Sequence, residues 1–442
     1  MSAADDLAAG LARALARAGL SPPSPPERLS GGANMESWRF AAGGDDFVLR
    51  RAPSSAMIAG RLLDHASEAR VIRAAPHAPE IVTELDPSDG IGSGFVMRAL
   101  PGTADPAAIL AGPNPDRLLA EIAAALAAIH RIDPAIDGLP AMDTAAALAD
   151  LRARFLAYGG DRPVIALALA WLAANLPEQI APHLVHGDFR LGNLLVEDGR
   201  LTGVLDWELA HAGDFHEDLA YGCMTVWRFA RPDRPALGLG GIDDYIAAYQ
   251  AGGGAPVDRA RFRFWLVYRT CWWALGCLQM GTFWRAGADR AVERVVVGRR
   301  AAEQELDLLL LLEEEAPEAE RKRPLPAAAA PLPAPVGEPS AAEIVTAVSE
   351  WLGSAVKPVL AGRDRFDLAV ARNALGIVAR ELTGRPTTHD SALAGDLLGG
   401  RITLAEPGLL ARLRRTTLDK LAADMPKYPG LALARQRWEG PA

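Results

Sequence analysis

Cysteine is scarce in this chain, and its scarcity limits the class of protein. The sequence contains only Cys223, Cys271 and Cys277. None of them forms a CxxC pair, and no cluster of histidines accompanies them. A disulfide framework and a structural zinc site are therefore poor explanations of the fold, and we expect a reducing, cytoplasmic setting.

Long apolar runs are also missing. The longest charge-free apolar stretches, such as residues 163–177, fall short of the roughly 18–20 residues that span a bilayer. The first twenty residues indicate an amphipathic helix with early acids, without the basic and apolar regions of a secretory signal. We therefore predict a protein with no membrane partner.

Positive charge is not in excess. The formal net charge is −9 and the sequence pI is about 5.5, whereas a nucleic-acid-binding protein normally shows a basic patch or stripe. We therefore predict no nucleic-acid partner. The 442 residues, half of them apolar, are enough for two or three domains with a large buried core.

The domain organisation is indicated by one change in composition. Residues 313–340 begin with charged residues and continue as a Pro/Ala-rich stretch that cannot pack a core, so they predict an extended linker. We predict five segments: an N-terminal helix over 1–24, a sheet-containing N-lobe over 25–101, a C-lobe over 102–312, a linker over 313–340 and a helical domain over 341–442.

The pattern of elements before the linker predicts an α+β fold with two lobes. Short β-like runs with turn residues fill 28–100, and one helix from about Ala56 to Ala75 lies among them. Residues 104–180 are mostly helical, with Ile122, Leu126 and Ile129 on one buried stripe. A hairpin follows over 193–207, and its Asp198-Gly199 pair is a strong turn signal.

The densest chemical signal is the run HGDFRLGN, residues 186–193, followed by VLDWE, residues 204–208. Asp188 and Asn193 have the Asp-x-x-x-x-Asn spacing of a kinase catalytic loop. The hairpin would bring Asp206 back opposite Asn193, and such oxygen ligands suit Mg²⁺. Phosphoryl transfer needs this set: a carboxylate for the acceptor hydroxyl, metal ligands, and a clamp for the triphosphate.

Each part of this signal has an ordinary structural explanation when it stands alone. A Gly-Asp pair is a common turn, a buried histidine is often a core residue, and an aspartate at the end of a hairpin is often a cap. The joint occurrence of all the parts at these spacings favours the phosphotransfer hypothesis over chance.

With these motifs, the chain resembles the aminoglycoside phosphotransferase and choline-kinase-like family over residues 25–310. The branch it is most similar to includes the kinase-like domain fused to acyl-CoA dehydrogenases. The resemblance implies a protein-kinase-like fold and the use of ATP and Mg²⁺. It implies that Asp188 is the catalytic base and that Asn193 and Asp206 are metal ligands. It also implies that His186 braces the loop, and that Arg190 either neutralises phosphate charge or anchors the loop.

The N-lobe fits this resemblance with one departure. Gly31 and Gly32 would let backbone N–H groups approach phosphate, although the stretch matches neither a Walker A nor a G-x-G-x-x-G sequence and is also explained by a hairpin turn. Arg50 stands where kinases of this type keep a phosphate-binding lysine, and the two side chains are not equivalent. Glu68 is the candidate partner of Arg50, with an exposed helix pair as the alternative.

Two further stretches match the family pattern. The strand GFVMRALPG, residues 94–102, resembles the hinge between the lobes, where Met97 to Ala99 would hold the adenine ring; a strand ending in a Pro-Gly turn is the alternative. Asp214 and Asp218 match an acidic stretch of the family in which a proline is replaced here by Phe215. We expect Asp218 to brace the catalytic loop from the start of a helix.

The sequence says less about the identity of the acceptor and about the role of the C-terminal domain. Residues 262–284 are rich in aromatic residues, which is typical of a core but would also suit the wall of an acceptor pocket for an apolar or anionic molecule. The helical segment over 341–442 resembles a small domain of uncharacterised function found with kinases of this branch. For that segment we expect a docking or regulatory role and a protein partner.

The sequence therefore predicts a Mg-ATP-dependent phosphotransferase acting on the hydroxyl group of a small molecule, with a hydroxyacyl-CoA or a hydroxy acid as the favoured acceptor. An aminoglycoside-type antibiotic kinase is the alternative within enzymes. A catalytically inactive pseudokinase adaptor is the alternative outside them, and Arg50 in place of lysine is the feature that favours it.

Overall fold

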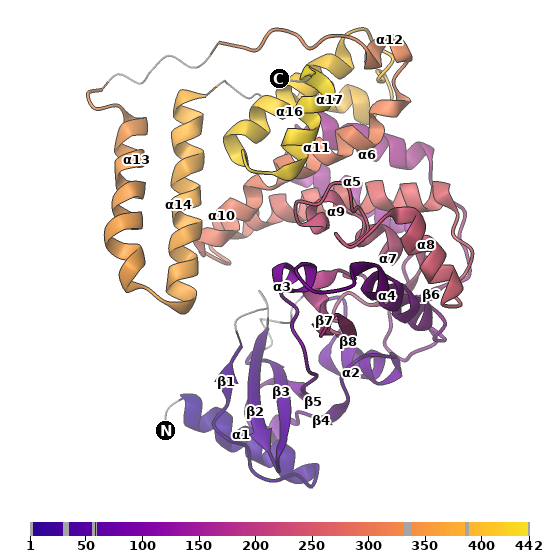
Figure 1. The fold of residues 1–442 in the computed structure, drawn as a ribbon, viewed down its shortest axis with the longest axis vertical. Coiled ribbons are helices and arrows are strands. Elements are labelled where there is room, and N and C mark those ends of the chain that lie inside the picture. Colours follow the sequence, from indigo (N-terminus) through magenta and orange to yellow (C-terminus); the bar gives the residue numbers. More distant parts are fainter. Residues whose placement is uncertain are drawn as a thin grey trace. The chain divides into compact units, whose positions relative to one another are not determined.

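The structure is a computed structural model that describes residues 3–29, 35–54, 58, 60–330, 337–384 and 389–440. Contacts within the chain define two compact units, and Figure 1 labels most of their helices and strands. Unit 1 comprises Met1–Asp143, Glu178–Phe229 and Asp233–Phe262, and unit 2 comprises Thr144–Pro177, Ala230–Pro232 and Arg263–Ala442.

Unit 1 begins with a five-stranded antiparallel sheet in the order β1-β2-β3-β5-β4. Its strands are β1 (Glu27–Arg28), β2 (Glu36–Ala42), β3 (Asp45–Ala52), β4 (Ile81–Glu84) and β5 (Ser93–Arg98). Successive side chains of a strand point to opposite faces. In β3, Phe47 and Leu49 are fully buried on one face, and this alternation places Arg50 on the other.

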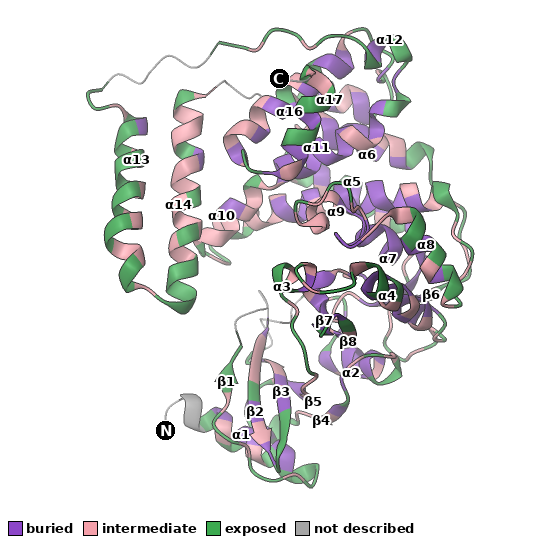
Figure 2. Ribbon diagram, in the orientation of Figure 1, coloured by how far each residue is buried: buried purple, intermediate pink, exposed green. Residues whose placement is uncertain are grey.

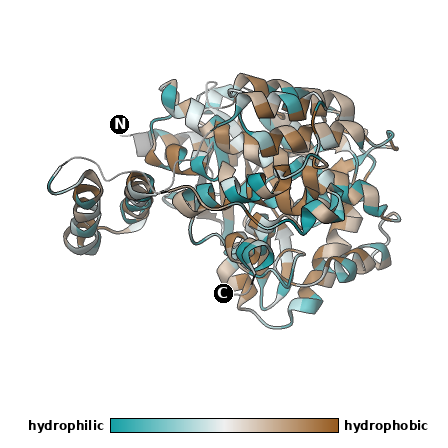
Figure 3. Cartoon of the chain, turned by 90° about the horizontal axis from the view of Figure 1, so that it is seen from above, coloured by the Kyte–Doolittle hydropathy of each residue, from teal (hydrophilic) through white to brown (hydrophobic). Residues whose placement is uncertain are grey.

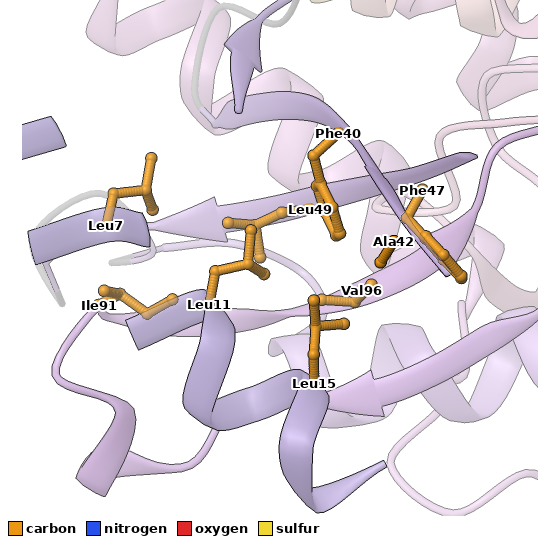
Figure 4. Close-up of a cluster of buried hydrophobic side chains, with 9 residues drawn as sticks. All are labelled: Leu7, Leu11, Leu15, Phe40, Ala42, Phe47, Leu49, Ile91 and Val96. Atoms are coloured by element: carbon orange, nitrogen blue, oxygen red, sulfur yellow. The ribbon is translucent and has the colours of Figure 1, made fainter. Parts of the chain in front are cut away.

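One face of this sheet is covered by the N-terminal helix α1 (Ala3–Arg17). Leu7, Leu11 and Leu15 recur every four residues along the helix and pack into the same cluster as Leu49 and Val96 of the sheet (Figure 4). Burying each leucine contributes roughly 1.5–3 kcal/mol. The helix is therefore an integral part of the N-lobe core.

Helix α2 (His65–Ala74) packs against β4 and β5. It begins where Asp64 caps it by accepting a hydrogen bond from the backbone N–H of Ser67 at 2.7 Å. Residues 60–64 are not helical, so the predicted start of this helix near Ala56 was too early. The sequence pattern did not reveal the cap. Ala56 itself lies outside the described residues. Glu68, in the first turn, is fully buried.

The helices and hairpin after the sheet confirm the predicted pattern. Ile122, Leu126 and Ile129 are fully buried on α4 (Pro115–His130), which follows the short α3 (Pro106–Leu110). The hairpin consists of β7 (Leu194–Glu197) and β8 (Arg200–Val204). Asp198 and Gly199 between them both have positive φ, as a two-residue hairpin turn requires.

Unit 2 is helical. Its helices are α5 (Thr144–Ala157), α6 (Pro163–Ala174), most of α9 (Arg259–Arg285), α10 (Val292–Arg299), α11 (Ala301–Leu312), α12 (Glu318–Arg321), α13 (Ala341–Trp351), α14 (Gly362–Thr383), α15 (Ser391–Leu398), α16 (Leu409–Asp424) and α17 (Pro429–Glu439). Helix α15 packs on α6, and α16 and α17 pack on α11. Trp265 and Tyr268, from the aromatic stretch on α9, are buried core residues.

The division of contacts does not follow the predicted boundary at residue 341, because the C-terminal helices share a core with helices from before it. Leu306 of α11 packs with Leu421 of α16 and Leu431 of α17. The predicted linker also begins with packed structure: Glu313 is buried and accepts hydrogen bonds from the Arg414 guanidinium at 3.1 and 2.5 Å. The five predicted segments remain a prediction of domain organisation.

Hydrophobic and hydrophilic residues are interspersed along the helices (Figure 3). No described helix is both long and apolar enough to cross a membrane. Helices α13 and α14 are exposed or half-buried over most of their length, whereas α11 is almost fully buried (Figure 2). Unit 2 therefore combines a dense core with a pair of helices that presents much of its surface to solvent.

Candidate active site

The predicted catalytic loop connects a pair of short strands to the hairpin. β6 (His183–Val185) pairs antiparallel with β9 (His211–Gly213), and residues 186–190 continue from the end of β6. Gly187 has a φ of +81°, and a Cβ atom placed on it would lie 2.5 Å from the carbonyl oxygen of Leu209. The loop therefore needs glycine at this position, because any other residue would meet both strain and backbone.

Asp218 holds the backbone of this loop from its buried side. It lies on α7 (His216–Tyr221), and its carboxylate accepts hydrogen bonds from the N–H of His186 at 2.7 Å and of Gly187 at 2.8 Å. Nε2 of His130 lies 3.1 Å from the same carboxylate. Burial opposes the ionisation of Asp218, but its hydrogen bond with His130 and the nearby charges hold its pKa below the ordinary value. This is the bracing geometry that the sequence predicts.

The His186 ring links the loop to the second strand of the hairpin. Its Nε2 lies 2.9 Å from the carbonyl oxygen of Leu205, and its Nδ1 lies 3.2 Å from the backbone nitrogen of Asp188. The carbonyl accepts and the backbone N–H donates, so these partners assign the ring proton to Nε2. Both ring nitrogens are thus occupied in holding the loop, as expected for a residue that braces it.

Asp188 is held on both of its oxygens. Nε of Arg190 donates to Oδ1 at 3.0 Å, and Nδ2 of Asn193 donates to Oδ2 at 2.6 Å. Arg190 also lies over the ring of Trp227, with its guanidinium carbon 4.6 Å from the ring centroid. Arg190 therefore contacts Asp188 within the loop, and the two roles that the sequence leaves open for Arg190 both remain predictions.

The hairpin brings Asp206 back beside Asn193. The backbone N–H of Leu205 donates to the carbonyl oxygen of Asn193 at 2.8 Å, which closes the open end of the hairpin. Asp206 follows directly with a φ of +67°, a left-handed conformation that aspartate tolerates better than most residues. The expected proximity of Asn193 and Asp206 is therefore present in the structure.

Arg50 connects the sheet to this hairpin. Its Nη2 donates to Asp206 Oδ1 at 2.6 Å and to Glu208 Oε2 at 3.1 Å. Its Nε lies 3.5 Å from Oε1 of Glu68, the predicted partner. Burial opposes the charged form of Arg50, but these three carboxylates raise the pKa of the guanidinium above its ordinary value. Burial likewise opposes ionisation of Asp206, yet Arg50 holds the pKa of that carboxyl below its ordinary value.

Arg61 joins the same cluster, although no sequence pattern predicts a role for it. Its Nη2 donates to Glu68 Oε2 at 2.9 Å and to Glu208 Oε2 at 3.2 Å. Burial, followed by the negative charge of Asp206, raises the pKa of Glu208 above its ordinary value. Arg61 lies in a stretch without motif or periodicity, so no pattern marked it. Glu208 stands in the VLDWE run, but the run alone predicts no role for it.

Two further predicted nucleotide contacts, Met97 and Ala99, lie in and just after strand β5. Met97 is paired within β5, and the backbone N–H of Ala99, just after this strand, donates to the carbonyl oxygen of Asp46 at 2.9 Å. This N–H is therefore engaged within the sheet, which leaves the carbonyl of Ala99 as its backbone group for a ligand. Gly31 and Gly32 lie outside the described residues.

The donor set next to Asp188 fits the magnesium ion that the sequence implies. Asn193 uses its amide nitrogen on Asp188, which leaves the oxygen Oδ1 as its side-chain ligand atom. Asp206 supplies an ionised carboxylate. No group of three or more His, Cys, Asp or Glu among the described residues could hold a metal on its own. One carboxylate and one amide suit Mg²⁺, which keeps waters and takes its other ligands from phosphate.

The N-terminal antiparallel sheet and the loop and hairpin that follow it define a protein of the kinase-like fold class. The model of the phosphotransferase enzyme family matches residues 26–265, more than half of the chain. The chain therefore belongs to this family. A crystal structure from Ralstonia eutropha assigned as an aminoglycoside phosphotransferase has 21% sequence identity and a TM-score of 0.53, with 66% of this chain and 93% of that chain covered. This similarity confirms the predicted fold class.

Curated relatives are similar to parts of the chain. Acyl-CoA dehydrogenase family member 10 of Mus musculus is 30% identical over 246 residues, which cover 49% of this chain and 22% of that protein. Family member 11 of Gallus gallus is 36% identical over 88 residues, which cover 19% of this chain and 11% of that protein. The matches thus span less than a quarter of these relatives. Residues 358–428 match the model of a domain of unknown function, DUF6285, as the resemblance of the C-terminal segment implied.

Proposed function

We propose that the chain is a kinase that transfers the γ-phosphoryl group of ATP to a hydroxyl group of a small molecule, with Mg²⁺ bound by Asn193 and Asp206. One observation carries this proposal: Asp188 is held by Asn193 in a braced loop, beside an Asp206 that is ion-paired with Arg50 of the sheet. The residues that we propose as base, metal ligands and phosphate-binding cation thus all belong to unit 1. Membership of the phosphotransferase family supports the same reaction class.

The roles that we propose follow from the positions of the side chains. Asp188 takes the proton of the acceptor hydroxyl while the new bond from that oxygen to the γ-phosphorus forms and the bond to the β–γ bridging oxygen breaks, which releases ADP. Mg²⁺ would neutralise charge on the phosphate oxygens. Arg50 would contact the same phosphates with its planar, permanently charged fork. Positioning and charge neutralisation would supply most of the rate enhancement.

The acceptor that we propose is a hydroxyacyl thioester or a hydroxy acid. The curated relatives that match parts of the chain are named acyl-CoA dehydrogenase family members, which is the reason for testing this class first. An aminoglycoside-type acceptor is the alternative within the family. An inactive adaptor is the alternative outside enzymes, and the presence of Asp188, Asn193 and Asp206 together argues against it.

We place this activity in the cytoplasm. Cys223, Cys271 and Cys277 are all free and buried. Burial raises the pKa of each thiol to about 12, so the three remain protonated and unreactive. Three unpaired cysteines are expected where thiols are kept reduced.

The experiment that tests the proposal is transfer from γ-labelled ATP, with Mg²⁺, to a panel of hydroxyacyl-CoA thioesters, hydroxy acids, choline-like alcohols, sugars and aminoglycosides. Asp188→Asn, which keeps the size of the side chain, is the matched control. We expect transfer to one class of acceptor and a loss of roughly 10²–10⁴-fold in kcat for the variant. Transfer that survives in Asp188→Asn would contradict the role of this residue, and a chain that binds no nucleotide would contradict the function.

We also propose that α13 and α14 form the protein-binding face of unit 2, and that a second copy of the chain binds there. Ile344, Val348 and Trp351 recur at i, i+4 and i+7 on α13 and are 52, 44 and 59% exposed. Helix α13 carries two glutamates and no Lys or Arg, whereas α14 carries four arginines and three acids. In a two-fold symmetric pair, the acidic helix of one copy would lie against the more basic helix of the other.

A further inference from the structure

Arg61, rather than Arg50, is the closer partner of the buried glutamate on α2. Nη2 of Arg61 is 2.9 Å from Oε2 of Glu68, whereas Nε of Arg50 is 3.5 Å from Oε1. Arg50 makes its shortest contact, 2.6 Å, with Asp206. The sequence predicted a single pair between Arg50 and Glu68, whereas in the structure both Arg50 and Arg61 lie within 4 Å of the Glu68 carboxylate.

The two arginines meet again at Glu208. Nη2 of each lies on the same carboxylate oxygen, Oε2, at 3.1 Å for Arg50 and 3.2 Å for Arg61. The cluster therefore gathers two guanidinium groups, of Arg50 and Arg61, and three carboxyl groups, of Glu68, Asp206 and Glu208.

The inner part of the cluster is not saturated with hydrogen bonds. Nε of Arg50, Nε of Arg61 and Oε1 of Glu68 are all buried without a hydrogen-bond partner among the described residues. Glu68 is fully buried, so its charge needs a close cation. Without Arg61, the only guanidinium left within 4 Å of Glu68 in the described structure would be that of Arg50.

We propose that Arg61 is a positioning residue that pairs with Glu68 and Glu208 and thereby keeps the Arg50 guanidinium beside Asp206, where it can bind the phosphates of the nucleotide. This inference rests on the proposed function. In this role Arg61 would act through Arg50, because the carboxylates that it contacts, Glu68 and Glu208, are also partners of Arg50. Its loss would let the buried carboxylate of Glu68 draw Arg50 away from the phosphates, so nucleotide binding would weaken while the catalytic loop stayed intact.

The test measures the dissociation constant of Mg-ATP by calorimetry, together with KM and kcat, for Arg61→Gln and for the double variant Arg61→Gln/Glu68→Gln. We expect the single variant to bind Mg-ATP about 10- to 100-fold more weakly, the range found when a supporting residue of a site is removed. The double variant, which also removes the charge that competes for Arg50, should recover most of this loss. A residue that only stabilised the fold would give no such recovery.

The matched control is Arg51→Gln. Arg51 is as buried as Arg50, but its guanidinium pairs with Glu36. We expect this variant to keep the wild-type affinity for Mg-ATP. If Arg51→Gln weakened nucleotide binding as much as Arg61→Gln, the effect would be a general one of the N-lobe and the inference would be wrong.

The other outcomes are equally decisive. An unchanged dissociation constant for Arg61→Gln overturns the inference while wild-type turnover preserves the proposed function. A loss that the double variant does not recover also overturns it. If Arg61→Gln fails to fold by thermal melting, Arg61→Lys, which keeps the charge, should stay within about threefold of the wild-type constant, and a tenfold loss would contradict us. Wild-type protein that binds no nucleotide overturns both proposals.

Discussion

The guanidinium of Arg50 lies 2.6 Å from the carboxylate of Asp206, and 156 positions separate the two residues in the chain. The ion pair joins β3 of the N-terminal sheet to the end of the β7–β8 hairpin. It places the cation that we propose for phosphate beside the acid that we propose for the metal. A ligand that bound both residues would replace this pair with contacts of its own.

The carboxylate of Asp206 should be essential for metal-dependent turnover. Asp206→Asn keeps the shape of the side chain and removes its charge, so we expect kcat to fall by roughly 10²–10³-fold and the Mg²⁺ concentration for half-maximal activity to rise. Titration of activity with Mg²⁺ checks this. Glu197→Gln, which alters an exposed acid on the same hairpin, is the control and should leave the titration unchanged. A wild-type titration curve for Asp206→Asn would remove this residue from the proposed metal site.

The stability that Asp218 provides should depend on pH. Its folded pKa is lowered, so its contribution is present above the unfolded pKa of about 3.9 and is lost as the pH falls through the folded value. Asp218→Asn should therefore cost about 2–4 kcal/mol at pH 7, and the gap to wild type should narrow below about pH 4. Urea unfolding of both proteins between pH 7 and pH 3 measures this gap. A difference in unfolding free energy that stayed constant with pH would mean that Asp218 stabilises the fold through the shape of its side chain and not through its negative charge.

Gly187 should be irreplaceable, and another glycine of similar conformation should not be. Gly187→Ala adds a methyl group that meets a carbonyl oxygen at 2.5 Å, whereas in Gly43→Ala, at a φ of +61°, the nearest atom lies 3.7 Å away. We expect the Gly43 variant to lose roughly 1–2 kcal/mol from its left-handed backbone alone. The Gly187 variant should lose at least about 3 kcal/mol of unfolding free energy. Equal unfolding free energies for the two would contradict the close approach.

The apolar stripe on α13 should determine the oligomeric state. Trp351→Glu places a charge in the proposed contact, so we expect a dimeric wild-type chain to become monomeric in sedimentation equilibrium at micromolar concentration. Leu156→Glu, which alters an exposed leucine on α5 (55% exposed), is the control and should leave the mass unchanged. A monomeric wild-type chain would exclude the second copy as the partner.

The parts of the site that the sequence could predict are those fixed by short-range spacing. Asp188 and Asn193 lie in one loop, and the Asp198-Gly199 turn signal determines where the hairpin returns the chain, so the neighbourhood of Asp206 follows from local geometry. The burial of Ile122 and Leu126 follows in the same way from helical periodicity.

The parts that it could not predict depend on contacts between distant segments. Arg61 carries no motif, and its role follows only from where α2 and the hairpin meet in space. The start of α2 depended on the cap formed by Asp64, which the apolar pattern does not mark. The packing of α16 and α17 on α11 was likewise invisible, because the Pro/Ala-rich stretch between them suggested separate domains.

The N-terminal helix belongs to the folded core of the N-lobe, although it lies outside the residues that match the family model. The family match begins at residue 26, yet Leu7, Leu11 and Leu15 fill the core beneath the sheet. A chain trimmed to the matched residues would leave Leu49 and Val96 facing water. Any transplantation of the catalytic lobe into another protein would therefore have to carry helix α1 with it.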